Sequence, residues 1–181
     1  MTARLWLVRH AAPRVAPGIC YGRLDVDADA QATQQAAQQL VQALPRGVLL
    51  RHSPLRRCAQ LADAVRALRP DLCSQADDRL QEMDFGAWEG QPWDAVPRAE
   101  LDAWAADLHA YAPGGGEPLA AMLARVRSAL EEPAPADTDR VWISHAGVAR
   151  CVHWLRTQPA RPATAAAWTQ AAPAPGQWFI S

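Results

Sequence analysis

The sequence lacks three features that would mark its class at once: a block of like charges, a long apolar run and a closely spaced pair of cysteines. Acidic and basic residues are interspersed and the formal net charge is -1, so we expect no extended basic face for nucleic acid. The apolar run near the start ends at Arg9, too early to cross a membrane, and no small-residue cleavage site follows it. We therefore expect a cytoplasmic protein without a signal peptide.

The four cysteines are scattered along the chain, at Cys20, Cys58, Cys73 and Cys151. No two have C-x-x-C spacing and none has a ligand-like spacing to histidine, which argues against structural zinc and against a disulfide framework. We expect these side chains to be reduced and buried, and to behave as small apolar residues. No metal site and no other cofactor site is indicated.

Strand-like and helix-like segments alternate along the chain. Short apolar runs indicate buried strands at 5–8, 48–50 and 141–143. Apolar residues at helical spacing indicate helices at 30–44, 53–68, 119–131 and 148–155. This order predicts an α/β protein with a three-layer α/β/α fold and a largely parallel central sheet. The length of 181 residues suits a single domain over residues 1–181.

Local signals add detail to this fold. Ser53 followed by Pro54 predicts a helix start at which the serine hydroxyl is the cap. Segment 177–180 is expected to form an edge strand. Segment 87–116 is irregular and rich in tryptophan, and it predicts a small lid-like excursion outside the sheet. Its tryptophans are expected to pack core and lid, with Trp88 a candidate to cover the apolar part of a substrate.

Charged and imidazole side chains follow three of the predicted strands. Arg9-His10 follows the first, Arg51-His52 the second, and His145 the last. The carboxyl ends of parallel strands meet at one edge of a sheet, where the loops leaving them form a crevice that binds ligands. We therefore expect these side chains to face a common site.

Four motifs carry a resemblance to the histidine phosphatase superfamily, also called the phosphoglycerate mutase-like family. They are Leu7-Val8-Arg9-His10-Ala11, Ser53-Pro54-Leu55-Arg56-Arg57, Leu80-Gln81-Glu82-Met83-Asp84-Phe85-Gly86 and Ser144-His145-Ala146-Gly147. They occur in the family's order and span most of the chain, so together they are far more specific than any one of them alone.

The resemblance implies a metal-independent phosphatase. His10 would attack phosphorus and form a phosphohistidine intermediate, while Arg9 and Arg57 would hold the phosphate oxygens with their planar forks. His145 would donate to an equatorial oxygen. Glu82 would protonate the leaving group and then take a proton from water, and it must therefore be protonated at working pH. The implied partner is a small phosphomonoester substrate.

A narrower resemblance, to bacterial alpha-ribazole phosphatases, rests on the loop at 20–25 and on the segment at 82–89. It adds alpha-ribazole 5'-phosphate as a candidate substrate. Tyr21 and Gly22 of this loop, and Ala146 of the Ser-His-x-Gly motif, are further candidate substrate-binding residues. Mutase chemistry is disfavoured because Arg98 is the only Arg or Lys between Gly86 and Gly116, where a second phosphate would need positive charge.

Several alternatives stay open at this stage. Arg56 is adjacent to Arg57, and Asp84 and Glu89 lie near Glu82. Ala11 replaces the family's glycine, which favours a rival hypothesis of a catalytically weak, phosphate-binding regulatory protein on the same fold. A phosphohistidine protein phosphatase is a third alternative, and a homodimer is also open. The other histidines, His52, His109 and His153, are expected to be structural or surface residues.

Overall fold

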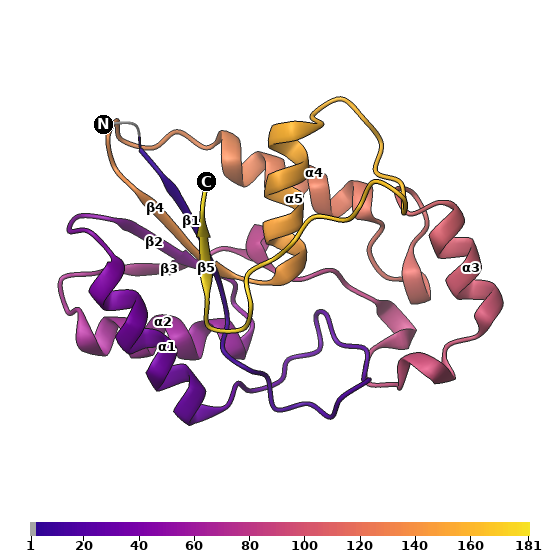
Figure 1. Ribbon diagram of the computed structural model, residues 1–181, viewed down its shortest axis with the longest axis horizontal. Coiled ribbons are helices and arrows are strands. Elements are labelled where there is room, and N and C mark those ends of the chain that lie inside the picture. The colour runs from indigo at the N-terminus through magenta and orange to yellow at the C-terminus, as the bar shows by residue number, and fades with distance from the viewer. Residues whose placement is uncertain (1–2) are drawn as a thin grey trace.

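A five-stranded sheet lies between two layers of helices in the computed structural model, which describes residues 3–181 (Figure 1). The strands stand in the order β3-β2-β4-β1-β5. Their bounds are β1 Leu5–Arg9, β2 Leu49–His52, β3 Ser74–Ala76, β4 Arg140–Ser144 and β5 Trp178–Ile180. Strands β1 to β4 pair in parallel, and β5 pairs antiparallel with β1 at the edge. The predicted α/β fold, its largely parallel sheet and its C-terminal edge strand are confirmed.

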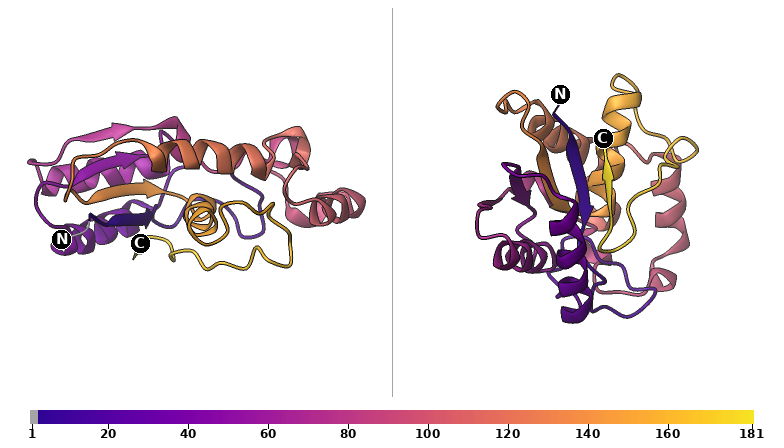
Figure 2. Two further views of the ribbon diagram at one scale, coloured as in Figure 1. Left: turned by 90° about the horizontal axis from the view of Figure 1, so that it is seen from above. Right: turned by 60° about the vertical axis from the view of Figure 1, so that its left-hand side comes forward.

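Four of the helices cover the two faces of the sheet (Figure 2). Helices α1, Ala30–Ala43, and α2, Arg56–Leu68, pack against each other on one face. Helices α4, Leu119–Glu131, and α5, Ala146–Thr157, pack against each other on the other face. No helix within residues 3–181 has both the length and the apolar character that crossing a membrane requires.

The central strand β1 sends side chains alternately into two apolar cores. Trp6 and Val8 belong to the core under α1 and α2, whereas Leu5 and Leu7 belong to the core under α4 and α5. A strand buried on both faces needs apolar residues at successive positions, because neighbouring side chains point to opposite faces. This requirement explains the uninterrupted apolar run at the start of the chain.

The parallel strands end at one edge of the sheet, as expected. Arg9 lies opposite Ser144 in the β1–β4 register. The next residue, His10, donates its backbone N–H to the Ser144 carbonyl at 3.1 Å, and the Ser53 N–H donates to the Ile143 carbonyl at 2.9 Å. The sheet register therefore places the residues that follow β1, β2 and β4 side by side.

The predicted helix start at Ser53 was wrong. Helix α2 begins at Arg56, and its capping residue Leu55 forms no side-chain cap. The Ser53 side chain is fully buried, where it accepts a hydrogen bond from the Leu55 N–H at 3.3 Å and contacts His145. The hydroxyl thus contacts both the turn before α2 and His145 at the sheet edge, but it is not the cap of the helix.

One of the four cysteines also departs from expectation. Cys20, Cys58 and Cys151 are buried, but Cys73 is exposed, because it precedes the short edge strand β3.

The excursion extends away from the sheet beside the carboxyl ends of its strands (Figure 1). It contains short 3-10 turns at Gly86–Trp88, Trp93–Ala95 and Pro113–Gly115, together with helix α3, Arg98–Ala106. Its two ends meet where Gly86 approaches Gly114: a Cβ on Gly86, whose φ is +53°, would lie 2.2 Å from the Gly114 carbonyl oxygen. Trp88, Trp93 and Trp104 pack together inside it.

Two leucines of α2 test the packing of the core. Leu61 is 0% exposed and Leu68 is 44% exposed. Leu61→Ala should lower the free energy of unfolding by about 2–5 kcal/mol, because the truncation leaves a cavity. Leu68→Ala should change it by no more than about 0.5 kcal/mol. Urea unfolding followed by circular dichroism measures both, and equal losses would contradict the packing described here.

Candidate active site

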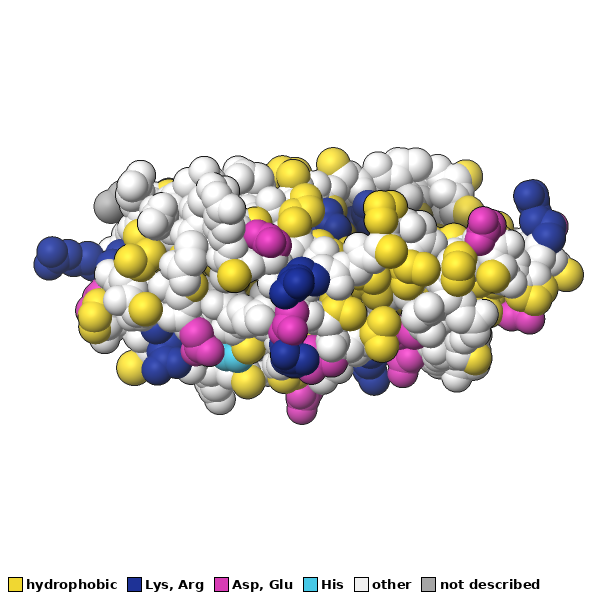
Figure 3. Space-filling model, turned by 90° about the horizontal axis from the view of Figure 1, so that it is seen from below, with side chains coloured by type: hydrophobic (Ala, Val, Ile, Leu, Met, Phe, Trp, Pro, Cys, Tyr) yellow, Lys and Arg dark blue, Asp and Glu magenta, His cyan; other side chains and the backbone are white. Residues whose placement is uncertain are grey.

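A cavity of about 460 Å³ opens at the carboxyl edge of the sheet. Its polar lining includes Arg9, His10, Tyr21 and Glu82. Much of the remaining lining is apolar or aromatic and comes from the excursion, from the segment before it, from α4 and from the chain after α5. It includes Phe85, Trp93, Trp104, Leu108, Met122 and Trp168. Apolar side chains gather on the half of the molecule that carries the excursion (Figure 3). The cavity therefore has a polar part at the strand ends and an apolar part beyond it.

His10 is held in one orientation at the end of β1. Its side chain is buried, and Nδ1 lies 2.7 Å from the Ala11 carbonyl oxygen. A carbonyl only accepts, so Nδ1 carries the proton and Nε2 keeps its lone pair. Burial, reinforced by the charge of Arg57, lowers the pKa of His10 from 6.5 to about 3. His10 is therefore a neutral imidazole at pH 7, with Nε2 available as a nucleophile.

Two arginines lie close enough to His10 for their charges to lower its pKa. Arg57 is fully buried and donates from Nη1 to the Leu24 carbonyl at 2.9 Å and from Nη2 to the Gly22 carbonyl at 2.5 Å. Arg9 donates from Nη1 to the Pro173 carbonyl at 3.2 Å. Within residues 3–181 the buried Nε of each arginine has no acceptor. Buried cationic N–H groups without an acceptor are costly, and an anion such as phosphate would supply one.

His145 lies behind His10, with the two ring centres 5.2 Å apart. Its Nε2 is 2.9 Å from the Ser53 hydroxyl and 3.5 Å from the Cys58 thiol. Burial, together with the positive charge of Arg57, holds the pKa of His145 well below its usual range. His145 is therefore neutral here and can act as a hydrogen-bond donor, while the positive charge of the site resides on the arginines.

Glu82 reaches the site from the segment after β3. Its Oε2 accepts from the Gly147 N–H in the first turn of α5 at 3.1 Å, and Oε1 accepts from the Met83 N–H at 3.1 Å. A Cβ on Gly147 would lie 2.0 Å from Glu82 Oε1. The glycine of the Ser-His-x-Gly motif thus makes room for this carboxyl group.

The alternative residues weighed from the sequence are engaged elsewhere. Asp84 accepts from the Gly86 N–H at 2.8 Å, and Glu89 accepts from the Arg23 N–H at 2.8 Å. Arg56 is exposed and pairs with Asp27 at 2.7 Å. The geometry therefore favours Glu82 over its acidic neighbours and Arg57 over Arg56.

The remaining candidates occupy different places. Tyr21 lines the cavity, and its ring lies 5.5 Å from the guanidinium of Arg57. Gly22 contributes the carbonyl that holds Arg57, and Ala146 is the buried first residue of α5. Neither Gly22 nor Ala146 lines the cavity, and the same holds for Arg57 and His145, which are almost completely buried.

Trp88 packs inside the excursion, as expected for the tryptophans as a group, and the alternative that it covers the substrate was wrong. Trp88 is 4% exposed and donates from its indole nitrogen to Glu100 at 2.8 Å, so it fills the interior of the excursion. Trp93 and Trp104 line the cavity instead. In an irregular segment no sequence period distinguishes a buried tryptophan from one that lines the cavity, so the sequence could not separate Trp88 from Trp93 and Trp104.

Sequence reasoning missed Arg150, which lines the cavity from α5. It lies three residues after Gly147, which puts both on the same face of the helix. Its Nε donates to the Gln170 carbonyl at 3.1 Å. That spacing from the Ser-His-x-Gly motif was the signal that could have identified it.

Ala11 fits the site without strain. Its side chain is 1% exposed within the apolar core under α1 and α2. Among residues 3–181, Asp137 is the only non-glycine residue with a positive φ, so the backbone at Ala11 does not require glycine. The replacement of the family's glycine therefore leaves the His10 geometry intact.

Comparisons with known proteins show the family of the chain. A sequence model of the histidine phosphatase superfamily (branch 1) matches residues 5–179. A Hydrogenobacter thermophilus protein provisionally named phosphoserine phosphatase 2 is 30% identical over 162 residues, which cover 85% of this chain and 78% of that protein.

Solved structures are similar along nearly the whole chain. The mycobacterial glucosyl-3-phosphoglycerate phosphatase in complex with VO3 has 26% identity and a TM-score of 0.78, covering 98% of this chain and 92% of that one. The Thermus thermophilus protein TTHB049 has 27% identity and a TM-score of 0.72, with the same coverage of the two chains.

The neutral state of His10 can be tested by NMR. The Cε1–H resonance of His10 should not shift between pH 8 and pH 5, because its pKa lies near 3. In the urea-unfolded chain the same resonance should titrate near about 6.5. The unfolded chain binds a proton through this window that the folded chain does not, so His10 should make stability fall as the pH drops below about 6.5. Titration of His10 near neutral pH in the folded protein would contradict the assignment.

Proposed function

Because the chain belongs to the histidine phosphatase superfamily (branch 1) and is a phosphoric monoester hydrolase, we propose that it cleaves a small phosphomonoester through a phosphohistidine on His10. The observation that carries the proposal is the state of His10. Its ring is neutral, and its Nδ1–H donates a hydrogen bond to the Ala11 carbonyl. The side chain lines the cavity, as does that of Arg9.

The first step transfers the phosphoryl group to His10. The substrate dianion occupies the polar end of the cavity beside Arg9 and His10, where the unpartnered Nε–H of Arg9 can donate to it. The proposal also requires the phosphate to reach the unpartnered Nε–H of Arg57, which is buried close to His10 and does not line the cavity in the structure. His10 Nε2 attacks phosphorus in line, the bond from phosphorus to the leaving oxygen breaks, and the Glu82 carboxyl group gives its proton to that oxygen. Neutral His145 donates a hydrogen bond to an equatorial oxygen as charge spreads over the three of them.

The second step releases phosphate. The Glu82 carboxylate takes a proton from water, the water oxygen bonds to phosphorus, and the bond from phosphorus to His10 Nε2 breaks. Glu82 then holds the proton needed for the next turnover, and His10 is again a neutral imidazole. Every proton and every bond in the cycle is accounted for by groups of this chain, by substrate and by water.

Alpha-ribazole 5'-phosphate remains the substrate candidate. The aromatic side chains of Phe85, Trp93 and Trp104 suit a flat, uncharged ring beyond the phosphate. The relatives are named for phosphoserine and for glucosyl-3-phosphoglycerate, which both carry a carboxylate. A carboxylate bound in the cavity would need a cation, and Arg150 is the lining residue that could pair with it. A phosphohistidine on a protein substrate would have to reach His10 past the same aromatic side chains of Phe85, Trp93 and Trp104. This favours a small-molecule substrate.

Loss of His10 is the first test. His10→Ala should abolish hydrolysis of p-nitrophenyl phosphate, while the unchanged protein should keep its activity in EDTA. His153→Ala, an exposed position on α5, is the matched control and should retain activity. Activity that survives in His10→Ala would contradict the mechanism. Tight phosphate or vanadate binding by the unchanged protein, with no turnover of any ester, would favour the regulatory alternative.

A substrate panel tests the apolar end. We expect kcat/KM for alpha-ribazole 5'-phosphate to exceed that for phosphoserine and for glucosyl-3-phosphoglycerate by about tenfold or more, the scale of a well-filled apolar pocket. Trp104→Ala should lower the first value and spare the other two. If the carboxylate-bearing esters are preferred and Arg150→Gln removes that preference, the assigned substrate class is wrong.

A further inference from the structure

The segment that carries Glu82 is the part of the site least supported by the sheet. After β3 the chain forms one 3-10 turn, Asp78–Leu80, and then runs without regular structure into the excursion. The carbonyls of Arg79, Gln81 and Glu82 all face helix α4, where each accepts a hydrogen bond from the same side chain. The position of Glu82 therefore depends on contacts with α4.

That side chain is Arg125. Its Nη1 donates to the carbonyls of Arg79 at 2.8 Å and Gln81 at 2.7 Å, and its Nη2 donates to the carbonyl of Glu82 at 3.2 Å. Glu117 accepts from Arg125 Nε at 2.7 Å and from Nη2 at 2.8 Å. These contacts use all five N–H groups of the guanidinium. Arg125 is only 15% exposed and Glu117 only 10%, so the pair is shielded from solvent.

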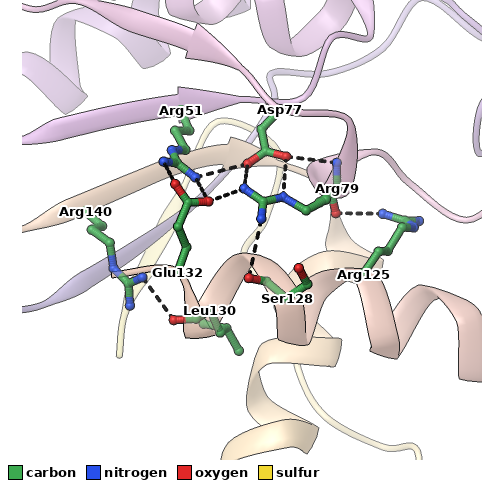
Figure 4. Close-up of polar contacts among 8 residues, drawn as sticks. All are labelled: Arg51, Asp77, Arg79, Arg125, Ser128, Leu130, Glu132 and Arg140. Atoms are coloured by element: carbon green, nitrogen blue, oxygen red, sulfur yellow. Dashed lines mark hydrogen bonds and ion pairs between the residues drawn. The ribbon is translucent and has the colours of Figure 1, made fainter. Parts of the chain in front are cut away.

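Side-chain contacts of Arg79 hold the start of the same segment. Arg79 binds Asp77 through Nε at 2.9 Å and through Nη2 at 2.7 Å, and it also contacts Glu132 at the end of α4. Arg51 of β2 joins both carboxylates, so the ion pairs connect the sheet, the turn and the helix (Figure 4). Arg125 adjoins this arrangement and donates to the Arg79 carbonyl (Figure 4).

We propose that Arg125 is a positioning residue for Glu82. It fixes the backbone of the segment from the α4 side, while the Gly147 N–H of α5 holds the carboxyl group 3.1 Å away on the other side. A general acid must lie within about 2.6–3.2 Å of the oxygen that it protonates, and a displacement of about 1 Å can cost about 100-fold in rate. The inference rests on the proposed function, in which Glu82 is that acid.

The choice of leaving group separates positioning from simple stabilisation. A nitrophenolate departs without a proton, whereas an alkoxide needs one, so the rate for an alkyl phosphate depends on Glu82 far more strongly. kcat/KM covers every step up to phosphoryl transfer and is therefore the quantity to compare. A loss of folded protein alone would lower both rates by the same factor.

The experiment measures kcat/KM of folded variants for p-nitrophenyl phosphate and for 2-phenylethyl phosphate. Arg125→Gln should lower the alkyl value by about tenfold or more and the aryl value by no more than about threefold, because Glu82 is displaced and its proton is misdirected. Arg125→Lys keeps the charge opposite Glu117 but has only three donors. Its kcat/KM for the alkyl ester should therefore lie between that of the unchanged protein and that of Arg125→Gln. Arg127→Gln, an exposed arginine on the same helix, is the matched control and should leave both rates unchanged.

Glu82→Gln, measured with the same two esters, separates the two hypotheses. If Glu82→Gln loses alkyl activity selectively but Arg125→Gln lowers both rates equally or neither, the positioning role is overturned and the proposed function stands. If Glu82→Gln shows no selectivity, the general-acid assignment fails and the inference fails with it. In the double variant the inference predicts no selective loss beyond that of Glu82→Gln alone.

Discussion

The buried charge of Arg57 is the interaction on which the rest of the site depends. A guanidinium with 0% exposure needs acceptors, and the carbonyls of Gly22 and Leu24 provide them, which brings the loop after β1 back over α2. The same positive charge adds to burial in lowering the pKa of His10 and of His145. A single buried cation therefore orders the loop, adds to burial in keeping the imidazoles neutral, and leaves its Nε without an acceptor.

The parallel sheet makes this arrangement possible because it brings residues from distant parts of the chain to one edge. His10 follows β1, Ser53 follows β2 and His145 follows β4, and the register among these three strands places them side by side. Glu82 is the exception, since it follows the short edge strand β3 and the sheet alone does not fix its side chain. The contacts to α4 and α5 supply what the sheet does not, so the acid and the nucleophile are held by different parts of the fold.

The sequence was sufficient for the fold and for the residues at the strand ends, because buried strands and helix stripes have clear periods. It predicted the places of Arg9, His10 and His145, whose strands end where the apolar runs end. It was not sufficient for Ser53, whose hydroxyl contacts a distant imidazole and does not cap its own helix, nor for Trp93 and Trp104, which line the cavity where Trp88 was the candidate. Arg125 could not be recognised either, since its role depends on which backbone carbonyls face its helix, whereas the spacing of Arg150 from Gly147 was a signal that could have been used.

The central claim is that His10 attacks phosphorus through Nε2 because Nδ1 is committed to the Ala11 carbonyl. The most direct test is to quench the reaction during turnover, digest the protein under alkaline conditions and identify the phosphohistidine isomer by mass spectrometry against synthetic standards. The account predicts an acid-labile phosphate on Nε2 of His10. Phosphate on Nδ1 of His10, on His145 or on no histidine at all would contradict it.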